Sequence, residues 1–166
     1  MNNFSNFLNM GKEMRYLSIA GVSAKYLTGC TKVSVGSCIV NEAGQILALG
    51  SNKAIPDLCK TQGCLRIAKY GDNAKTHRNP DDCRAIHSEV DAICFAAKMG
   101  VKLKGATIYV TRYPCESCAR AIVQSGIKHV VFGREQDISE ETARIFKAGG
   151  VTYEKFPDYQ EDDTAI

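Results

Sequence analysis

The sequence predicts a single α/β domain, built on a mixed five-stranded sheet with helices on both faces. The chain has 166 residues, a length that suits one domain with a substantial hydrophobic core. Two short apolar runs near its start are separated by a compact turn, which is typical of an antiparallel hairpin. The second half alternates apolar runs with helical patterns, which favours largely parallel strands joined by right-handed crossovers.

The N-terminal half is expected to begin with a helix and to continue as a hairpin. Between residues 10 and 28 apolar side chains recur at near-helical spacing, and Gly29 then ends the run. The stretches VSVGSCIV (33–40) and QILALGS (45–51) flank the turn NEAG, so we expect two antiparallel strands. The following segment, about 53–84, is long, polar and irregular. Such a length inside a compact domain suggests a functional or metal-tied loop.

The C-terminal half is expected to supply the other three strands and three helices. The strands are ATIYVTRY (106–113), KHVVFG (128–133) and VTYEKF (151–156). One helix opens at His87, a second begins near Pro114 and a third covers 139–150. On the first of these, the stripe that we expect to be buried consists of Val90, Ile93, Cys94 and Ala97. Residues 157–166 are acidic and predict a solvated tail.

Composition narrows the class of function. The net charge is only +3 and the basic residues are scattered, so binding to a long nucleic acid is not indicated. Charged or polar residues interrupt every apolar run before it could span a membrane. The N-terminus lacks a secretory pattern, so we expect a cytoplasmic protein. Eight cysteines in that compartment favour thiolate chemistry or metal ligation over disulfides.

His87 and Glu89 stand two residues apart at a predicted helix start. On a finished helix such residues point about 200° from each other, so they converge only in the first turn. Taken alone, the pair also fits an ordinary solvent-facing helix start.

Cys115 and Cys118 begin the next predicted helix. Pro114 suits the first helical position, which places both sulfurs on one face of the first turn. Unpaired backbone N–H groups and the helix dipole favour thiolates there. Taken alone, the C-x-x-C spacing also fits a redox pair or half of a structural zinc site.

Together, the two stretches match the zinc-deaminase signature H-x-E…P-C-x-x-C. Three protein ligands leave a zinc ion one position for water, which is typical of catalysis, and zinc lowers the pKa of that water toward about 7. Glu89 would carry protons from the water to the ring nitrogen and to the departing ammonia. A zinc-stabilised binding module with a closed four-ligand site is the non-enzymatic alternative.

From about Cys30 to Phe156 the chain resembles the deoxycytidylate (dCMP) deaminase family, which has the three-layer αβα cytidine deaminase-like fold. The matching stretches are VGSCIV, IHSEVDAI, GATIYVTRYPCESCARAIVQSGIKHVVF and AGGVTYEKF. The resemblance implies zinc-dependent hydrolysis of dCMP to dUMP and ammonia in pyrimidine nucleotide metabolism. It also implies a homo-oligomer, from dimer to hexamer, and dCTP and dTTP as effectors.

The chain departs from the family after the second predicted strand. The family reads G-Y-N-G where this chain reads Gly50-Ser51-Asn52-Lys53. Asn52 keeps the position whose relative contacts the nucleotide sugar, and Lys53 would approach a 5′-phosphate as a point charge. The departure leaves a nucleoside, a free base or a 5-modified dCMP as alternative substrates. A deaminase that edits nucleic acid would need a basic, aromatic groove, which a chain without tryptophan disfavours.

The resemblance extends to family members that hold a second, structural zinc ion between the end of the first helix and the long segment. It implies the ligands Cys30, Cys59, His77 and Cys83, with Cys64 in reserve. Folding of the segment would then depend on the metal. Cys38 and Cys94 lie in apolar patterns and are expected to be small buried residues.

Overall fold

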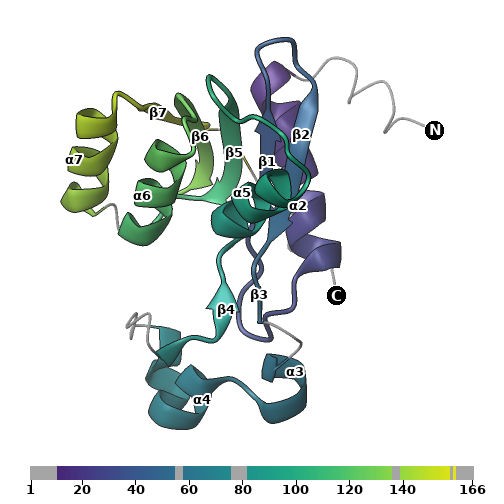
Figure 1. The fold of residues 1–166 in the computed structure, drawn as a ribbon. Helices are drawn as coiled ribbons and strands as arrows, with labels where there is room; N and C mark the ends of the chain where they lie inside the picture. The colour runs from purple at the N-terminus through teal and green to yellow at the C-terminus, as the bar shows by residue number, and fades with distance from the viewer. Residues whose placement is uncertain (1–10, 55–57, 76–81, 136–138, 158, 160–166) are drawn as a thin grey trace.

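The computed structural model describes residues 11–54, 58–75, 82–135, 139–157 and 159. Its main sheet has five strands in the order β2-β1-β5-β6-β7 (Figure 1). The strands are β1 (Gly36–Val40), β2 (Ile46–Ser51), β5 (Thr107–Arg112), β6 (His129–Arg134) and β7 (Thr152–Lys155). β1 is antiparallel to both β2 and β5, whereas β5, β6 and β7 are parallel. The predicted mixed sheet is confirmed.

Four long helices cover the two faces of the sheet (Figure 1). They are α2 (Lys12–Leu27), α5 (Ser88–Lys98), α6 (Glu116–Gln124) and α7 (Glu140–Gly149). On one face, Leu17 and Ala20 of α2 pack against Val40 and Tyr109. The opposite face and its three helices form the larger core cluster. The result is the three-layer αβα arrangement expected from the sequence.

Two glycines allow helices to approach the hairpin closely. A Cβ atom at Gly36 would lie 1.9 Å from the carbonyl oxygen of Ala20 on α2. A Cβ atom at Gly50 would lie 2.0 Å from the carbonyl oxygen of Ser88, at the start of α5. No side chain fits in either place, so glycine at position 50 fixes how closely the first turn of α5 sits against β2.

The segment predicted to be irregular contains short regular elements. β3 (Lys53–Ala54) pairs antiparallel with β4 (Ala85–Ile86), forming a separate two-stranded sheet. Between them lie α3 (Leu58–Gln62), α4 (Leu65–Tyr70) and the 3₁₀ helix η1 (Gly71–Lys75). We call residues 58–75 the insert; Figure 1 shows it below the starts of α5 and α6. Its helices span only five or six residues, which is too short for a periodic apolar pattern.

The predicted buried stripe on α5 is partly wrong. The buried residues of this helix are Ser88, Glu89, Ala92 and Ala96. Of the predicted stripe, Val90 and Ile93 are half-buried, whereas Cys94 and Ala97 are exposed. Residues four apart, which include 88, 92 and 96, follow one side of a helix, and here that side faces the sheet. Cys38 is fully buried as expected, and burial raises the pKa of its thiol to about 12.

The C-terminal end is not solvated throughout. Tyr159, within the segment predicted to be a tail, is buried and packs with Val131 and Leu17. Residues 158 and 160–166 of this segment lie outside the described part of the chain. Among the described residues, no helix combines the length and the apolar character needed to cross a membrane.

Candidate metal centre and active site

His87 and Glu89 enter the site from the first turn of α5. β4 ends at Ile86, and His87 is the N-cap of α5 with an extended backbone, φ −80° and ψ 155°. Glu89 follows inside the helix and is 4% exposed. Both residues line one cavity of about 850 Å³. The helix start therefore brings the two groups together, as the sequence predicted.

Cys115 and Cys118 reach the same place from the start of α6. The helix begins at Glu116 with Cys115 as its N-cap, so Pro114 lies before the helix and not at its first position. Helix boundaries inferred from a pattern shift by one or two residues in this way. The spacing still holds, because Cys118 lies one turn after Cys115 and is fully buried.

The three predicted ligands converge. The Nδ1 atom of His87 lies 3.4 Å from the Sγ atom of Cys115 and 3.4 Å from that of Cys118. All three atoms lie within 4.8 Å of one another. Tetrahedral zinc with ordinary Zn–S and Zn–N bonds separates a sulfur and a nitrogen ligand by about 3.6 Å. The donor set therefore fits a zinc ion.

Electrostatics at the centre favour a thiolate. Hydrogen bonds with Cys118, His87 and Ser117 lower the pKa of Cys115 to about 3. The hydrogen bond with Cys115, together with the charge of Glu89, raises the pKa of His87. Burial raises the pKa of Glu89, although its Oε2 atom accepts a hydrogen bond of 3.0 Å from the Ser88 hydroxyl. A buried carboxyl with a raised pKa suits a group that must both take up and release a proton.

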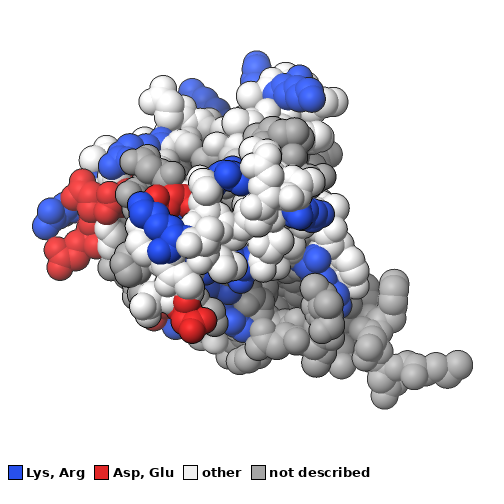
Figure 2. Space-filling model, turned by 90° about the horizontal axis from the view of Figure 1, so that it is seen from below, with Lys and Arg blue, Asp and Glu red and all other residues white. Residues whose placement is uncertain are grey.

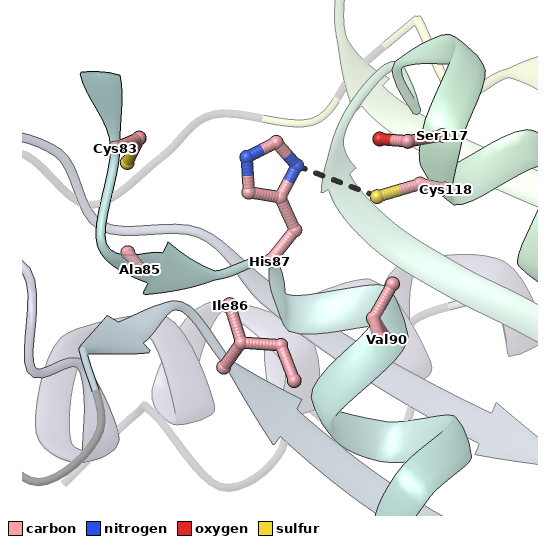
Figure 3. A pocket seen from close by; sticks show the side chains of 7 residues that line it. All are labelled: Cys83, Ala85, Ile86, His87, Val90, Ser117 and Cys118. Atoms are coloured by element: carbon pink, nitrogen blue, oxygen red, sulfur yellow. Dashed lines mark hydrogen bonds between the residues drawn. The ribbon is translucent and has the colours of Figure 1, made fainter. Parts of the chain in front are cut away.

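A smaller cavity of about 210 Å³ adjoins the same ligands (Figure 3). Figure 3 shows the His87 imidazole between Cys83 on one side and Ser117 and Cys118 on the other. Val90 of α5 and Ile86 of β4 line the same space. Cys83, two residues before β4, therefore lines the same cavity as the metal ligands His87 and Cys118.

Asn52 and Lys53 are placed differently from each other. Asn52 lines the larger cavity, and its Oδ1 atom accepts hydrogen bonds from the backbone N–H of Val35, at 2.7 Å, and the hydroxyl of Thr28, at 3.0 Å. It thus holds the segment before β1 as well as facing the cavity. The Lys53 Nζ atom lies 2.9 Å from Asp91 Oδ2, and Lys53 does not line the cavity. The predicted contact between Lys53 and a 5′-phosphate in this cavity is therefore not supported.

The cavity also contains cations that sequence reasoning missed. Among the described residues these are Lys32, Arg66, Arg112 and Arg120. Arg112 and Arg120 flank the cysteine motif, so their proximity to the site could have been inferred from the sequence. No local pattern marks Arg66, which comes from the insert.

The residues suggested for a second metal site are partly assembled. Burial raises the pKa of Cys59, and the nearby thiols of Cys64, Cys30 and Cys83 raise it further. The Cys64, Cys30 and Cys83 thiols therefore lie near enough to Cys59 to affect its pKa. Their sulfur atoms are not as close together as the ligand atoms of His87, Cys115 and Cys118. His77 lies outside the described residues.

With the geometry established, comparison with known proteins gives the family. The family described as the cytidine and deoxycytidylate deaminase zinc-binding region matches residues 10–134. The chain belongs to this family. Within this deaminase family, the ComE operon protein 2 of Bacillus subtilis is 36% identical over 129 residues, covering 76% of this chain and 61% of that protein. The deoxycytidylate deaminase of Homo sapiens is 36% identical over 126 residues, covering 74% of this chain and 67% of that protein.

A solved deaminase structure has the same fold. The dCMP deaminase from the cyanophage S-TIM5, in complex with dCMP and dUMP, superposes with a TM-score of 0.66 at 26% identity. The match covers 89% of this chain and all of that chain. By contrast, the match spans only about three fifths of the Bacillus protein.

Proposed function

We propose that this protein hydrolyses the amino group of dCMP to give dUMP and ammonia, at a zinc ion held by His87, Cys115 and Cys118. One observation carries the proposal: a buried carboxyl, Glu89, lines the same cavity as His87 and Cys115, and these two ligands converge with Cys118 in a zinc-type set. The relatives named deoxycytidylate deaminase support the substrate, as does the neighbour that holds dCMP and dUMP.

Glu89 is the proton carrier of the proposed reaction. Zinc, when bound, supplies a water molecule whose pKa is lowered toward about 7. Glu89 accepts one proton from that water and donates it to the ring nitrogen of cytosine, which makes the adjacent carbon more electrophilic. The remaining hydroxyl oxygen then bonds to that carbon. Glu89 accepts the second proton, from this hydroxyl, and donates it to the amino group; the C–N bond breaks, ammonia leaves, and the carbon keeps the oxygen as the carbonyl of dUMP. The Ser88 hydroxyl holds Oε2 of Glu89 in place during these transfers.

The cavity suits a nucleotide. Its volume of about 850 Å³ lies within the usual range for small-molecule sites. Its cations can compensate the charge of one phosphate. These features support a nucleoside monophosphate in preference to a free base, which carries no phosphate.

A substrate panel tests the assignment. The zinc-loaded protein is assayed with dCMP, 5-methyl-dCMP, deoxycytidine, cytosine, dCTP and a short single-stranded oligonucleotide. We expect the highest kcat/KM for dCMP, by about tenfold or more over deoxycytidine, because loss of a charge-assisted contact costs that much. Turnover of the oligonucleotide alone would reject dCMP as the substrate and indicate an editing deaminase. The highest kcat/KM for deoxycytidine, cytosine or the 5-methyl nucleotide would also reject the substrate while keeping the chemistry.

We further propose a second, structural zinc ion, held by Cys30, Cys59 and Cys83 and completed by His77 or Cys64. The nearness of the Cys64, Cys30 and Cys83 thiols, which raise the pKa of Cys59, supports the site, and the charge of Arg84 partly offsets that raised pKa. A metal count should give two zinc ions per chain for the parent and one for Cys59→Ser. Of the variants His77→Ala and Cys64→Ser, the one that removes the true fourth ligand should also lose one ion. A parent with a single zinc ion would reject the site.

We also infer a cytoplasmic homo-oligomer, from dimer to hexamer, with dCTP and dTTP as effectors. Exposed apolar side chains on α2, on α5 and at the C-cap of α5 support self-association; they include Val22, Tyr26, Phe95 and Met99. Light scattering of the purified protein should give a mass at least twice 18.1 kDa. Adding dCTP should lower the KM for dCMP, and dTTP should raise it. A monomer, or a KM that neither nucleotide changes, would reject the corresponding part of this inference.

A further inference from the structure

We propose that Arg66 of the insert contacts the 5′-phosphate of the bound nucleotide and thereby determines the preference for a nucleotide over a nucleoside. The inference rests on the proposed function and adds to it a substrate contact from outside the family's signature motifs. It makes the insert a wall of the active site as well as a structural appendage.

Arg66 reaches the active-site cavity from the insert. It is the second residue of α4, and it lines the same cavity as Glu89 and Cys115. These two residues come from the starts of α5 and α6, whereas Arg66 comes from the insert, which Figure 1 shows below those helix starts. The reacting end of cytosine must lie at the metal ligands. The phosphate, at the other end of the nucleotide, therefore extends toward a more distant wall.

The other cations of the cavity are less suited to this contact. The Lys32 ammonium donates a hydrogen bond to the carbonyl oxygen of Ala74. Arg120 is 62% exposed and lies 3.7 Å from Glu116, whose other oxygen accepts a hydrogen bond from Ser139. Arg112 ends β5 three residues before the ligand Cys115, close to where the base must lie. Arg66 lines the cavity from the insert, and its guanidinium can bind two phosphate oxygens at once.

The surrounding surface agrees with an anionic ligand. Figure 2 shows the molecule from below, the side on which the insert lies, with Lys and Arg side chains across the face. Acidic side chains gather mainly at its left edge, on the side of α7. A phosphate approaching the cavity thus meets mostly positive side chains.

α4 is anchored in a way that fixes Arg66. Asp82, just before β4, accepts hydrogen bonds from the Tyr70 hydroxyl, at 2.6 Å, and from the Lys69 ammonium, at 2.9 Å. Residues 66, 69 and 70 share one side of the helix, because they are three and four positions apart. The hydrogen bonds from Tyr70 and Lys69 lower the pKa of Asp82, and the charges of Lys69 and Arg66 lower it further. Arg66 is therefore held at a defined place and not on a freely rotating surface helix.

The anchoring also connects the phosphate contact to the cysteine cluster. Cys64 is the N-cap of α4, and its carbonyl oxygen accepts a hydrogen bond of 2.9 Å from the N–H of Ala68. Cys64 and Arg66 therefore lie on the same first turn of α4. One short helix, α4, therefore connects a cysteine of the proposed second zinc site with the arginine proposed to contact the phosphate.

The test compares steady-state kinetics of Arg66→Gln, Arg66→Lys and the control Arg144→Gln with the parent. Arg144 is a fitting control because it is 71% exposed on α7 and its ion pairs within the described part of the chain are with the surface residues Glu140 and Glu141. We expect Arg66→Gln to raise the KM for dCMP by about tenfold or more, with kcat and zinc content within about twofold of the parent. Arg66→Lys should recover part of the loss, and Arg144→Gln should match the parent.

Each other outcome rejects a defined statement. An active parent with an unchanged KM in Arg66→Gln rejects the phosphate contact and leaves the proposed function intact. A loss of kcat together with zinc assigns Arg66 a structural role and also rejects the contact. A parent that does not deaminate dCMP rejects the proposed function, and the contact with it.

Discussion

The two groups of cysteines belong to very different parts of the molecule. Cys118 lies on α6 beside Ala119 and Ile122, which are fully buried in the main core. Cys59 and Cys64 lie on or next to helices of five and six residues, and α4 buries none of its side chains. Among the described residues, Cys115 and Cys118, together with His87, form the only group that brings three ligand atoms within 4.8 Å of one another. One site is positioned by the hydrophobic core, whereas the other has little core of its own.

This difference indicates that folding depends on the metal at one site and not at the other. Ligands on elements that the core already holds need no metal to find their positions, so the metal there is free to serve chemistry. Ligands on short helices with little buried surface gain most of their order from the ion itself. The comparison predicts that the two sites respond differently to substitution, chelation and acid.

The largest effect is expected from removing a ligand of the catalytic centre. His87→Ala should lower dCMP turnover about 1000-fold or more, because the metal contributes several kcal/mol to lowering the barrier. The melting temperature should change little, because the core does not depend on this ion. Kinetics and thermal unfolding measured together check both statements. A large fall in melting temperature would contradict the separation between core and metal.

A glycine of the scaffold should matter nearly as much. In Gly50→Ala the new Cβ would meet the Ser88 carbonyl at 2.0 Å, so the first turn of α5 must shift. Overpacking of this kind costs about 1–3 kcal/mol of unfolding free energy, and His87 and Glu89 move with the turn. Denaturant unfolding and dCMP kinetics should both show losses. Gly11→Ala, whose Cβ would meet nothing closer than 3.9 Å, is the control and should keep parental activity.

Graded chelation should separate the two regions. As zinc is withdrawn, amide hydrogen exchange should rise first in the insert, residues 58–75, while β5 and β6 stay protected. The reason is that the core strands are buried on both faces independently of metal. Equal loss of protection in both regions would show that the domain unfolds as one unit.

The smallest effect is expected from neutralising Asp82, either at low pH or by substitution. The hydrogen bonds from Tyr70 and Lys69 lower the pKa of Asp82 below its ordinary value. Because the folded-state pKa is depressed, this stabilisation is complete above the unfolded pKa and is lost as pH falls through the folded value. Asp82→Asn should mimic that loss at neutral pH, with faster exchange in α4 and a KM for dCMP raised about two- to fivefold. Parental exchange in α4 would mean that the anchor is unimportant.

Sequence reasoning succeeded where the signal is local. The zinc ligands and Glu89 lie within two short stretches at helix starts, so spacing alone determines which side chains can meet. The five strands of the main sheet are long enough for apolar patterns to mark them. The short helices of the insert carry no such pattern.

Long-range contacts explain what the sequence could not give. Lys53 was expected at a phosphate, but it pairs with Asp91, 38 positions away in the chain. Cys94 is exposed because packing on the sheet selects the side of α5 that carries Ala92 and Ala96. Arg66 faces the cavity through the folding of the insert, which no spacing rule describes.

The most direct test of the account measures zinc content and dCMP turnover together in the parent and in Glu89→Gln. Glu89 lines the metal cavity but is assigned no bond to the ion, and glutamine keeps its size without its ability to exchange a proton. The account predicts parental zinc content and a kcat lowered at least about 100-fold. A Glu89→Gln variant that turns over dCMP within about twofold of the parent, or that loses its zinc, would contradict it.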